Sequence, residues 1–453
     1  MNIPAKDLVQ LIFQKCAGKS GCEVCRPHME EDCLFFPELY RLNDEMIEKG
    51  KSPESKHLGR LLDLCTLCGL CPCQNIRMLI LAAKAAFAKE EGLTLSSGFL
   101  SDVEKAGRIG TKFPNTANFL NTGRPFSIFT KKLMKIHNDR CLPVFPRQSF
   151  FRWAQNKGLH HKKKSESAAQ KVAYFAGCSA GYLYPEVGKA TVNLLEKTGA
   201  EVFVPEQHCC SMPLLMEGQR EKAMEKIRAN VATLIGAVRD GYQLVYSCPT
   251  CGYFYKKLLL ENAYYSDAFQ EKLKAENNIM KIPFGSGTDT FISLPKNIYQ
   301  KILKDDGYFS SIDPLDRIEL SQKGKDLGEY LLSFCQENKS LFRINGSQMP
   351  MLYFPPCHQR EQEIGQPYFK ILSSILGTDI RQVGGALDCC GMGGHLGYKK
   401  SFHPSALKLG RPLFEKLIRE EHRTIVTDCL SCRMQFEQQL PMKVYHPAEV
   451  LSL

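Results

Sequence analysis

The chain has 453 residues, 43% of them hydrophobic, which is enough for two or three domains with cores of their own. Its 20 cysteines do not fit a disulfide-stabilised secreted protein, because the chain is long and residues 1–13 carry no secretory signal pattern. We therefore expect a cytoplasmic protein whose cysteines bind metal. The longest apolar stretch, residues 78–88, is too short to cross a bilayer, so a membrane role would be peripheral or through a partner.

Residues 1–100 hold the first eight cysteines and predict a helical, ferredoxin-like module. Its core is the run Cys65-x2-Cys68-x2-Cys71, which has the spacing of a [4Fe-4S] motif. In two-cluster ferredoxins such a run takes its fourth ligand from elsewhere, and we expect Cys33 to supply it. The sequence therefore predicts one ferredoxin-type cluster on these four cysteines.

The other four cysteines of this part are Cys16, Cys22, Cys25 and Cys73. They depart from the usual C-x2-C-x2-C-x3-C-P spacing, because Cys16 is displaced and Cys73 lies close to Cys71. Two interpretations stay open: a second [4Fe-4S] cluster, which would make this a two-cluster module, or four spare thiols.

Residues 101–170 form a basic segment. Between Lys105 and Lys164 there are 14 lysines and arginines but one acid, Asp139, so this segment carries +13 against +11 for the whole chain. Apolar residues lie between the lysines and predict an amphipathic interfacial helix: Phe126, Ile128, Phe129, Leu133, Met134 and Ile136. We expect docking to a membrane or a membrane-bound partner rather than a solvated linker. No nucleic-acid partner is expected, because no nucleic-acid-binding motif accompanies the charge.

Residues 171–453 contain an internal repeat. In the first copy, a strand at 172–177 ends in Cys178, a second at 202–205 leads to Cys209-Cys210, and a third at 244–247 ends in Cys248-x2-Cys251. Helical stretches are predicted between them, at 185–199 and at about 218–240. The second copy repeats the order, with strands at 351–356, 380–383 and 424–428 that lead to Cys357, Cys389-Cys390 and Cys429-x2-Cys432, at offsets of 179, 180 and 181 residues. Near-constant offsets over ten cysteines indicate a duplication.

Strands that alternate with helices predict a parallel α/β sheet in each copy. Because ligands bind at the carboxyl ends of such strands, cysteines just past the strand ends should meet in one place. We expect a first α/β domain at 171–254, an insertion and connection at 255–340, and a second α/β domain at 341–453.

Each copy offers five cysteines, which exceeds the four ligands of a zinc site. Neighbouring side chains diverge, so an adjacent pair such as Cys389-Cys390 does not easily hold one metal ion through both sulfurs. The pattern therefore favours a polynuclear iron–sulfur site. A zinc-stabilised scaffold stays open as an alternative.

The duplicated C-x(30)-CC-x(37)-CxxC pattern resembles the CCG domain, which occurs in the HdrB-type component of heterodisulfide reductase and in the iron–sulfur subunits of glycolate, lactate and glycerol-3-phosphate dehydrogenases. The resemblance is strongest to the C subunits of anaerobic glycerol-3-phosphate dehydrogenases, carried by the segments 136–143, 205–215 and 410–415. It implies one or two CCG-bound clusters, with the non-cubane [4Fe-4S] form among the candidates. The implied ligands are Cys178, Cys209, Cys210, Cys248, Cys251, Cys357, Cys389, Cys390, Cys429 and Cys432. Ser211 departs from the family pattern, because Gly stands there in the family, as Gly391 does in the second copy.

The resemblance implies an iron–sulfur electron-transfer subunit of a flavin-linked dehydrogenase complex. Electrons would come from a flavoprotein partner and leave toward quinone or a similar acceptor, with the protein peripheral on the inner face of the cell membrane. The alternative is a catalytic disulfide reductase. Cys141 and Cys335 are left over and are expected to be ordinary buried thiols. His358, His395 and His446 lie near cysteine motifs, and we expect them to make local hydrogen bonds rather than to ligate metal.

Overall fold

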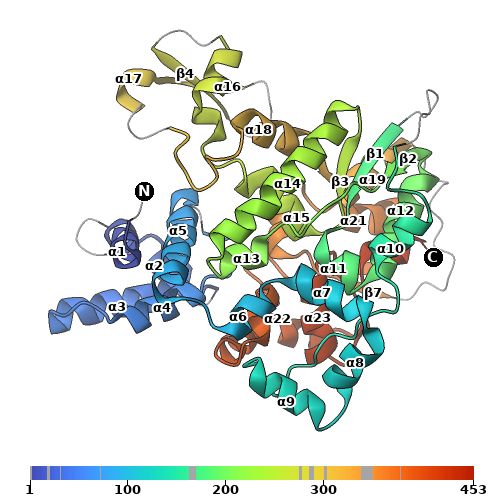
Figure 1. The fold of residues 1–453 in the computed structure, drawn as a ribbon, viewed down its shortest axis with the longest axis horizontal. Helices are drawn as coiled ribbons and strands as arrows, with labels where there is room; N and C mark the ends of the chain where they lie inside the picture. Colours follow the sequence, from blue (N-terminus) through green and yellow to red (C-terminus); the bar gives the residue numbers. More distant parts are fainter. Residues whose placement is uncertain are drawn as a thin grey trace.

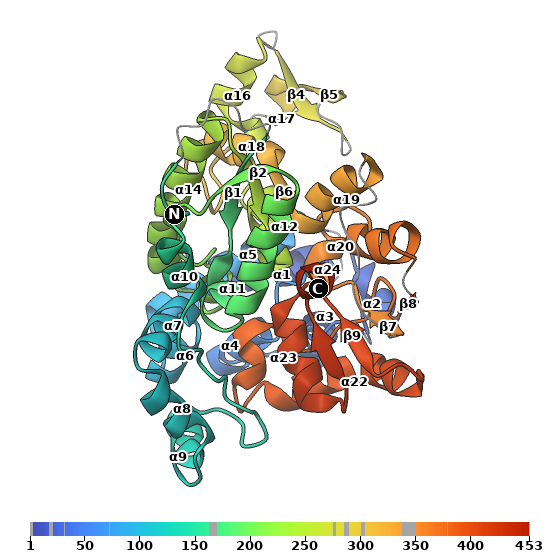
Figure 2. The ribbon, with the colours of Figure 1, turned by 90° about the vertical axis from the view of Figure 1, so that its right-hand side faces the viewer.

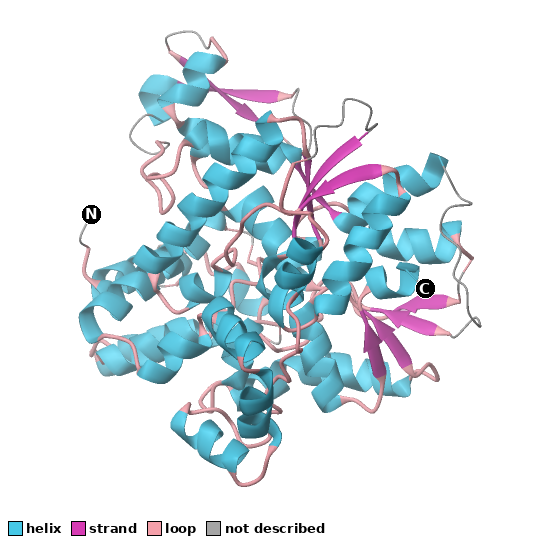
Figure 3. Ribbon diagram, turned by 45° about the vertical axis from the view of Figure 1, so that its right-hand side comes forward, coloured by secondary structure: helices cyan, strands magenta, loops and turns pink. Residues whose placement is uncertain are grey.

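The computed structural model describes residues 3–17, 21–30, 32–71, 73–162, 170–274, 278–284, 290–299, 304–337, 350–377 and 379–452. Lys163 and Lys164, at the end of the basic segment, lie outside the described residues. Helices dominate the fold and surround two small parallel sheets (Figures 1 and 3). No helix within the described ranges has the length and hydropathy that a bilayer crossing requires.

Helices make up most of the described N-terminal part. Its helices are α1 (Ala5–Cys16), α2 (Cys25–His28), α3 (Phe35–Lys49), α4 (Ser55–Asp63) and α5 (Gln74–Glu91). Helices α1 and α5 pack against each other, and α1 buries Leu8, Val9 and Ile12 at the spacing of one helical face. Cys16 ends α1 and Cys25 begins α2, and the other six cysteines of this part lie in the loops between the helices, so the helical core fixes where the thiols lie.

After α6 (Leu95–Leu100), the basic segment folds into short helices rather than one: α7 (Val103–Lys112), α8 (Pro114–Thr122), α9 (Phe126–Leu133) and α10 (Phe150–Asn156). The predicted interfacial helix corresponds to α9, which ends at Leu133. Ile136 lies past its end and is buried, so it belongs to the attachment of the segment and not to an exposed apolar face.

The first sheet has the order β2-β1-β3-β6, with all strands parallel. Its strands are β1 (Gln170–Phe175), β2 (Ala200–Phe203), β3 (Gln243–Tyr246) and β6 (Gly324–Asp326). Its helices are α11 (Gly177–Tyr182), α12 (Pro185–Lys197), α13 (Met212–Met216), α14 (Arg220–Arg239) and α15 (Pro249–Tyr253). Strand β2 is buried along its whole length, as expected for a sheet covered by helices.

The second sheet has the order β10-β9-β7-β8 and is also parallel. Its strands are β7 (Met351–Tyr353), β8 (Ile380–Gln382), β9 (Thr424–Val426) and β10 (Lys443–Tyr445). The accompanying helices are α20 (Cys357–Arg360), α21 (Pro367–Lys370), η4 (Ile371–Ile375), η5 (Gly394–Tyr398), α22 (His403–Arg419), α23 (Leu430–Gln439) and α24 (Pro447–Ser452). In both sheets the first strand of the copy lies between the second and the third, and the fourth follows the third. The predicted α/β duplication is confirmed.

A long segment between the CxxC motif of the first copy and its fourth strand, β6, interrupts that copy. It contains η1 (Phe254–Leu258), η2 (Ala263–Tyr265), α16 (Asp267–Lys272), β4 (Ile279–Pro283), β5 (Phe291–Pro295), α17 (Lys296–Tyr299) and α18 (Pro314–Lys323). The antiparallel β4–β5 pair projects from one end of the molecule (Figure 1). After it the chain returns to the first sheet as β6 and continues into α19 (Leu327–Glu337). Residues 255–340 therefore include the fourth strand of the first copy.

In each copy, the last helix packs against a helix of the other copy. Helix α24, which ends the second copy, packs against α12 of the first (Figure 2). Helix α19, which ends the first copy, packs against α21 of the second. Residues of both sheets, including Tyr174 and Tyr353, share one hydrophobic core. The copies are therefore held together through a common core and not only by the chain that links them.

Candidate metal centres

The cysteines of the first copy all lie just past the carboxyl ends of its strands. Cys178 is in α11, directly after β1, and Cys248 precedes α15, directly after β3. The pair Cys209-Cys210 lies in the loop between β2 and α13. The parallel sheet brings these loops to one edge, as the strand pattern predicts.

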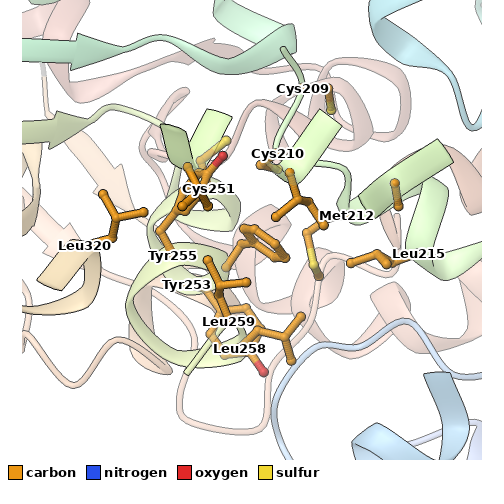
Figure 4. Packing of buried hydrophobic residues seen from close by; sticks show 14 of the residues in the cluster. Cys209, Cys210, Met212, Leu215, Cys251, Tyr253, Tyr255, Leu258, Leu259 and Leu320 are labelled. Atoms are coloured by element: carbon orange, nitrogen blue, oxygen red, sulfur yellow. The ribbon is translucent and has the colours of Figure 1, made fainter. Parts of the chain in front are cut away.

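Within this group the thiols touch one another. The Sγ atoms of Cys178 and Cys209 are 3.4 Å apart. The hydrogen bond with Cys209, together with burial, holds the pKa of the Cys178 thiol well above its ordinary value. Figure 4 shows Cys210 and Cys251 beside Met212 and Tyr255 within one hydrophobic cluster. The five thiols therefore form one interacting group within the first copy, with Cys178 and Cys248 partly buried and the other three buried.

The second copy places its cysteines in the same way. Cys357 begins α20 after β7, Cys429 precedes α23 after β9, and Cys389-Cys390 lies between β8 and η5. The Sγ atoms of Cys390 and Cys432 are 3.0 Å apart. The backbone N–H of Gly391 donates to Cys389 Sγ over 3.3 Å, but the hydrogen bond with Cys390 and burial hold the pKa of the Cys389 thiol well above its ordinary value.

The residue after each Cys-Cys pair adopts the left-handed backbone conformation. Gly391 has φ of 78°, and a Cβ at this position would lie 2.0 Å from the Ala406 carbonyl oxygen. Glycine is therefore required there. Ser211, where the family pattern has glycine, has φ of 74° and is fully buried. The chain path after the pair is thus preserved in the first copy despite the serine.

The inner N-terminal group consists of Cys33, Cys65, Cys68 and Cys71. Cys33 lies just before α3, and the other three lie in the loop between α4 and α5. Burial and the neighbouring Cys68 raise the pKa of Cys33 to about 12. All four line one cavity together with Cys357 and Cys389 of the second copy, which we call the shared cavity. The cysteine spacing predicts the group of four thiols, but no sequence pattern indicates that they lie beside Cys357 and Cys389.

The outer N-terminal group consists of Cys16, Cys22, Cys25 and Cys73. These thiols line a second cavity, near the surface, at the end of α1 and the start of α5. Burial and the charges of Cys25 and Cys73 raise the pKa of Cys16 to about 12, while Cys22 and Cys73 are exposed. Cys71 lines the same cavity, so the outer and inner groups are neighbours.

The family of cysteine-rich CCG domains matches residues 172–256 and again residues 351–437. The chain contains two CCG cysteine-rich domains. They are the two copies described above, and each match includes all five cysteines of its copy.

Known proteins of several kinds are similar to this chain. The C subunit of anaerobic glycerol-3-phosphate dehydrogenase from Escherichia coli (strain K12) is 23% identical over 361 residues, which is 79% of this chain and 77% of that protein. The B subunit of the CoM/CoB fumarate reductase from Methanothermobacter marburgensis is 22% identical over 64% of this chain and 46% of its own length. Lactate utilization protein A of Bacillus pumilus is 24% identical over 62% of this chain and 99% of its own length. Two of these names denote subunits of a dehydrogenase or a reductase.

His358, the residue after Cys357 of the second CCG domain, joins three cysteine loops. Its Nε2–H donates to the Leu67 carbonyl in the inner N-terminal loop over 2.9 Å. Its Nδ1 then accepts from the Thr250 hydroxyl, between Cys248 and Cys251 of the first CCG domain, also at 2.9 Å. The ring stacks on Tyr253 with 4.7 Å between centroids. The sequence predicts a local hydrogen bond for this histidine, whereas the structure gives it bonds to two other parts of the chain.

A second junction surrounds Glu217, at the end of α13. Its carboxylate is 2.9 Å from His395 Nε2 and also pairs with Lys399, both in the second CCG domain. These partners hold the pKa of Glu217 at about 2 even though burial acts in the opposite direction. Nearby, Lys84 of α5 donates to the carbonyls of Met216 and Cys65, over 3.0 and 3.2 Å. Buried charged side chains thus join the N-terminal part to the first CCG domain, and the first CCG domain to the second.

The remaining candidates have ordinary surroundings. His446 accepts from the backbone N–H of Ala448 and also bonds the Ser247 carbonyl, so it closes the interface between the two sheets. Cys335 is buried as expected, but Cys141 is exposed, so the expectation of a buried thiol is wrong there. The rings of His137 and His403 stack at 3.9 Å with planes 22° apart. Nearly parallel rings do not direct their nitrogens to one point, so we regard this pair as packing.

The donor sets fit iron–sulfur clusters. All 20 cysteines are free thiols, and 18 of them fall into the four groups above. Each CCG domain offers one thiol more than a tetrahedral zinc ion takes. A buried thiol with a raised pKa stays protonated in the absence of metal. A bound metal ion would replace that proton and neutralise the thiolate charge.

Proposed function

We propose that the chain is an iron–sulfur electron-transfer subunit of a flavin-linked dehydrogenase complex. It would take electrons from a flavoprotein subunit and pass them toward quinone or a similar acceptor. The observation that carries this proposal is the shared cavity, where Cys68 and Cys71 of the N-terminal part meet Cys357 and Cys389 of the second CCG domain. A redox chain needs its centres side by side, and the fold brings together groups that are almost 290 residues apart in sequence.

The proposed ligands are the four groups of thiols. A ferredoxin-like module would hold one [4Fe-4S] cluster on the inner group and a second on the outer group. The CCG domains would hold one or two further clusters, with non-cubane [4Fe-4S] clusters as the form that the family resemblance implies. When bound, such clusters supply one-electron transfer.

The neighbouring residues suit this role. Burial raises the pKa of the Cys65 thiol, and the charges of Lys84 and Arg77, two cations of α5, oppose that rise. Arg77 also donates to Tyr253 of the first CCG domain over 2.8 Å and to the Gly69 carbonyl over 3.3 Å. Two cations beside the inner thiols stabilise negative charge there, and thus favour the reduced over the oxidised form of a bound centre.

The contacts between groups suggest an order. The outer group adjoins Cys71 of the inner group, and the inner group adjoins the second CCG domain through the shared cavity. The proposed path therefore runs between the surface-exposed outer group and the buried CCG groups. The names of the relatives support a catalytic partner, which we propose to be the flavoprotein. We further propose a cytoplasmic protein that is peripheral on the inner face of the cell membrane, near a quinone-reducing partner.

The test is the metal content of anaerobically purified protein. We expect brown protein with on the order of 12–16 irons per chain, from three or four clusters. Stoichiometric zinc with almost no iron would instead identify a zinc-stabilised scaffold and refute the proposal.

A catalytic disulfide reductase is the second candidate. Cys357 and Cys389 are only partly buried and face the shared cavity, which Arg360 also lines. A small anionic disulfide could reach them there. Reduction of small disulfides by the isolated, chemically reduced chain would favour this candidate, whereas turnover that requires a flavoprotein would favour the electron-transfer role.

A further inference from the structure

The α8–α9 hairpin, residues 113–133, has its apolar side chains on the outside. Helix α8 buries no residue, and the one buried residue of α9 is Ser127. The exposed side chains are Phe113, Phe119, Leu120, Phe126, Ile128, Phe129 and Leu133, with Phe129 and Leu133 at 68% and 67% exposure. A soluble helix normally does the reverse and buries its aromatic and leucine residues. Phe119 and Phe126, one from each helix, lie with ring centroids 4.8 Å apart, and exposed apolar side chains gathered in this way mark an interaction site.

The base of the hairpin is held firmly, so the exposed tip is not a loose segment. Ile136 pairs with Lys399 in a β-bridge, and His137 N–H donates to the Tyr398 carbonyl over 3.0 Å. The buried guanidinium of Arg140 donates to the Gly397 carbonyl over 2.7 Å and to Gln435 Oε1 over 2.5 Å. These partners all belong to the second CCG domain.

Helix α8 is fixed from the other side. The Asn118 side chain donates to the Phe145 carbonyl over 2.9 Å and accepts from the Phe145 N–H over 2.7 Å. Asn121 donates to the Pro143 carbonyl over 2.8 Å. The hairpin projects from the edge of the molecule in both ribbon views, away from the two sheets (Figures 1 and 2).

The charge around the apolar tip is of one sign. Lys112, Arg124, Lys132 and Lys135 are exposed, and within the described ranges none of them pairs with a carboxylate. Lys131 donates to the Asn138 carbonyl and also has no acidic partner there. The sequence contains no acid between Lys105 and Asn138. An apolar tip with a purely basic rim matches the interface of an anionic bilayer, in which acyl chains lie beneath negative headgroups.

We propose that the α8–α9 hairpin inserts its apolar tip into the interface of an anionic lipid bilayer and thereby docks the protein. This deepens the peripheral membrane location proposed above by naming the docking surface and its partner, the lipid itself. The hairpin carries no proposed cluster ligand, so docking and metal binding can fail independently.

The test uses the purified holoprotein and protein-free vesicles. We expect co-flotation with phosphatidylcholine vesicles that contain phosphatidylglycerol, weaker flotation at high salt, and little with phosphatidylcholine alone. The double variant Phe129→Ser/Leu133→Ser should lower the partition coefficient at least about tenfold, because two large apolar side chains no longer enter the acyl region. Arg124→Gln/Lys132→Gln should weaken binding at low salt and reduce its salt dependence, because two of the five rim cations are removed.

A matched control keeps the comparison sharp. Ile47→Ser/Ile418→Ser removes two apolar side chains of similar exposure, 66% and 54%, on α3 and α22. It should bind vesicles as the wild type does. Iron content, measured in parallel, should be unchanged in all three variants, which separates loss of docking from loss of clusters.

Two results would overturn the inference. Failure of the wild type to float with anionic vesicles at low salt would do so, and binding only to native membranes would then assign the surface to a protein partner. Equal binding by the wild type and by Phe129→Ser/Leu133→Ser would show that charge alone acts and that the tip does not insert.

Discussion

The two CCG domains share a strand order and a cysteine pattern, but they place their thiols in different surroundings. In the first domain, Cys209, the counterpart of Cys389, is buried, and its Sγ lies 3.4 Å from that of Cys178. In the second, Cys357 and Cys389 open onto the cavity that they share with the N-terminal cysteines. Duplication thus reproduced a set of five cysteines, and the neighbours of each copy decide what can reach it.

Removing one thiol from each CCG domain tests most directly whether the two domains hold separate clusters. Cys210→Ser and Cys390→Ser occupy matching positions, 180 residues apart. Each should lose about one cluster, roughly four irons, and leave the N-terminal module intact, because the proposed ligand sets do not overlap. Iron analysis and electron paramagnetic resonance of the two variants check this. Loss of every signal in a soluble, folded variant would refute separate sites.

The residue after the cysteine pair also differs between the domains: it is Gly391 in the second and Ser211 in the first. Gly391→Ser should lower the free energy of unfolding by about 3–4 kcal/mol, because a left-handed conformation and a backbone clash combine. The clash is with the Ala406 carbonyl, 2.0 Å from the new Cβ. Urea unfolding measures the loss. The reciprocal Ser211→Gly should be neutral or stabilising by up to about 1 kcal/mol, and a large loss there would contradict the backbone argument.

The position after the first cysteine of each domain tests the junction of three cysteine loops. His358→Ala should lower the free energy of unfolding by about 3 kcal/mol, because it leaves a buried cavity and two unpaired groups, the Leu67 carbonyl and the Thr250 hydroxyl. The matching Ser179→Ala should change it by less than about 0.5 kcal/mol, since no side-chain bond of Ser179 crosses domains. Urea unfolding again decides, and equal effects would show that His358 joins nothing essential.

The Glu217 network tests the contact between the domains. Its pKa of about 2 lies below the ordinary 4.5, so its contribution to stability is complete above about pH 4.5 and is lost as the pH falls toward 2. Glu217→Gln should therefore cost about 2 kcal/mol at pH 7, where His395 and Lys399 lose their charged partner. Glu186→Gln, on an exposed carboxylate that pairs with Lys189, is the control and should be nearly neutral. If the two variants unfold alike, the buried pair contributes nothing special.

Much of the fold could be predicted from local pattern. Strands near 172, 202, 244, 351, 380 and 424 were expected where β1, β2, β3, β7, β8 and β9 lie, because short apolar runs bounded by turns have few alternatives. The fourth strands could not be predicted. Strand β6 is three residues long and follows a segment of some seventy residues, so it has no periodicity to detect.

The basic segment, too, could be predicted only in part. Its charge and its apolar residues are visible in the sequence, and both predict an interfacial helix. The sequence could not tell that Ile136 is buried while Phe129 and Leu133 face outward. That difference arises from the bridge to Lys399, a contact across more than 260 residues.

The sequence by itself determined the number of thiols, their grouping into repeated sets and the strand ends that carry them, because metal-ligand spacing and strand periodicity are local properties. Only the tertiary structure decided which sets are neighbours. The shared cavity, the bonds of His358 and the packing of α19 and α24 against the other copy all join residues distant in sequence. Such contacts follow from how the sheets bury their apolar faces against one another, and no local pattern encodes that arrangement.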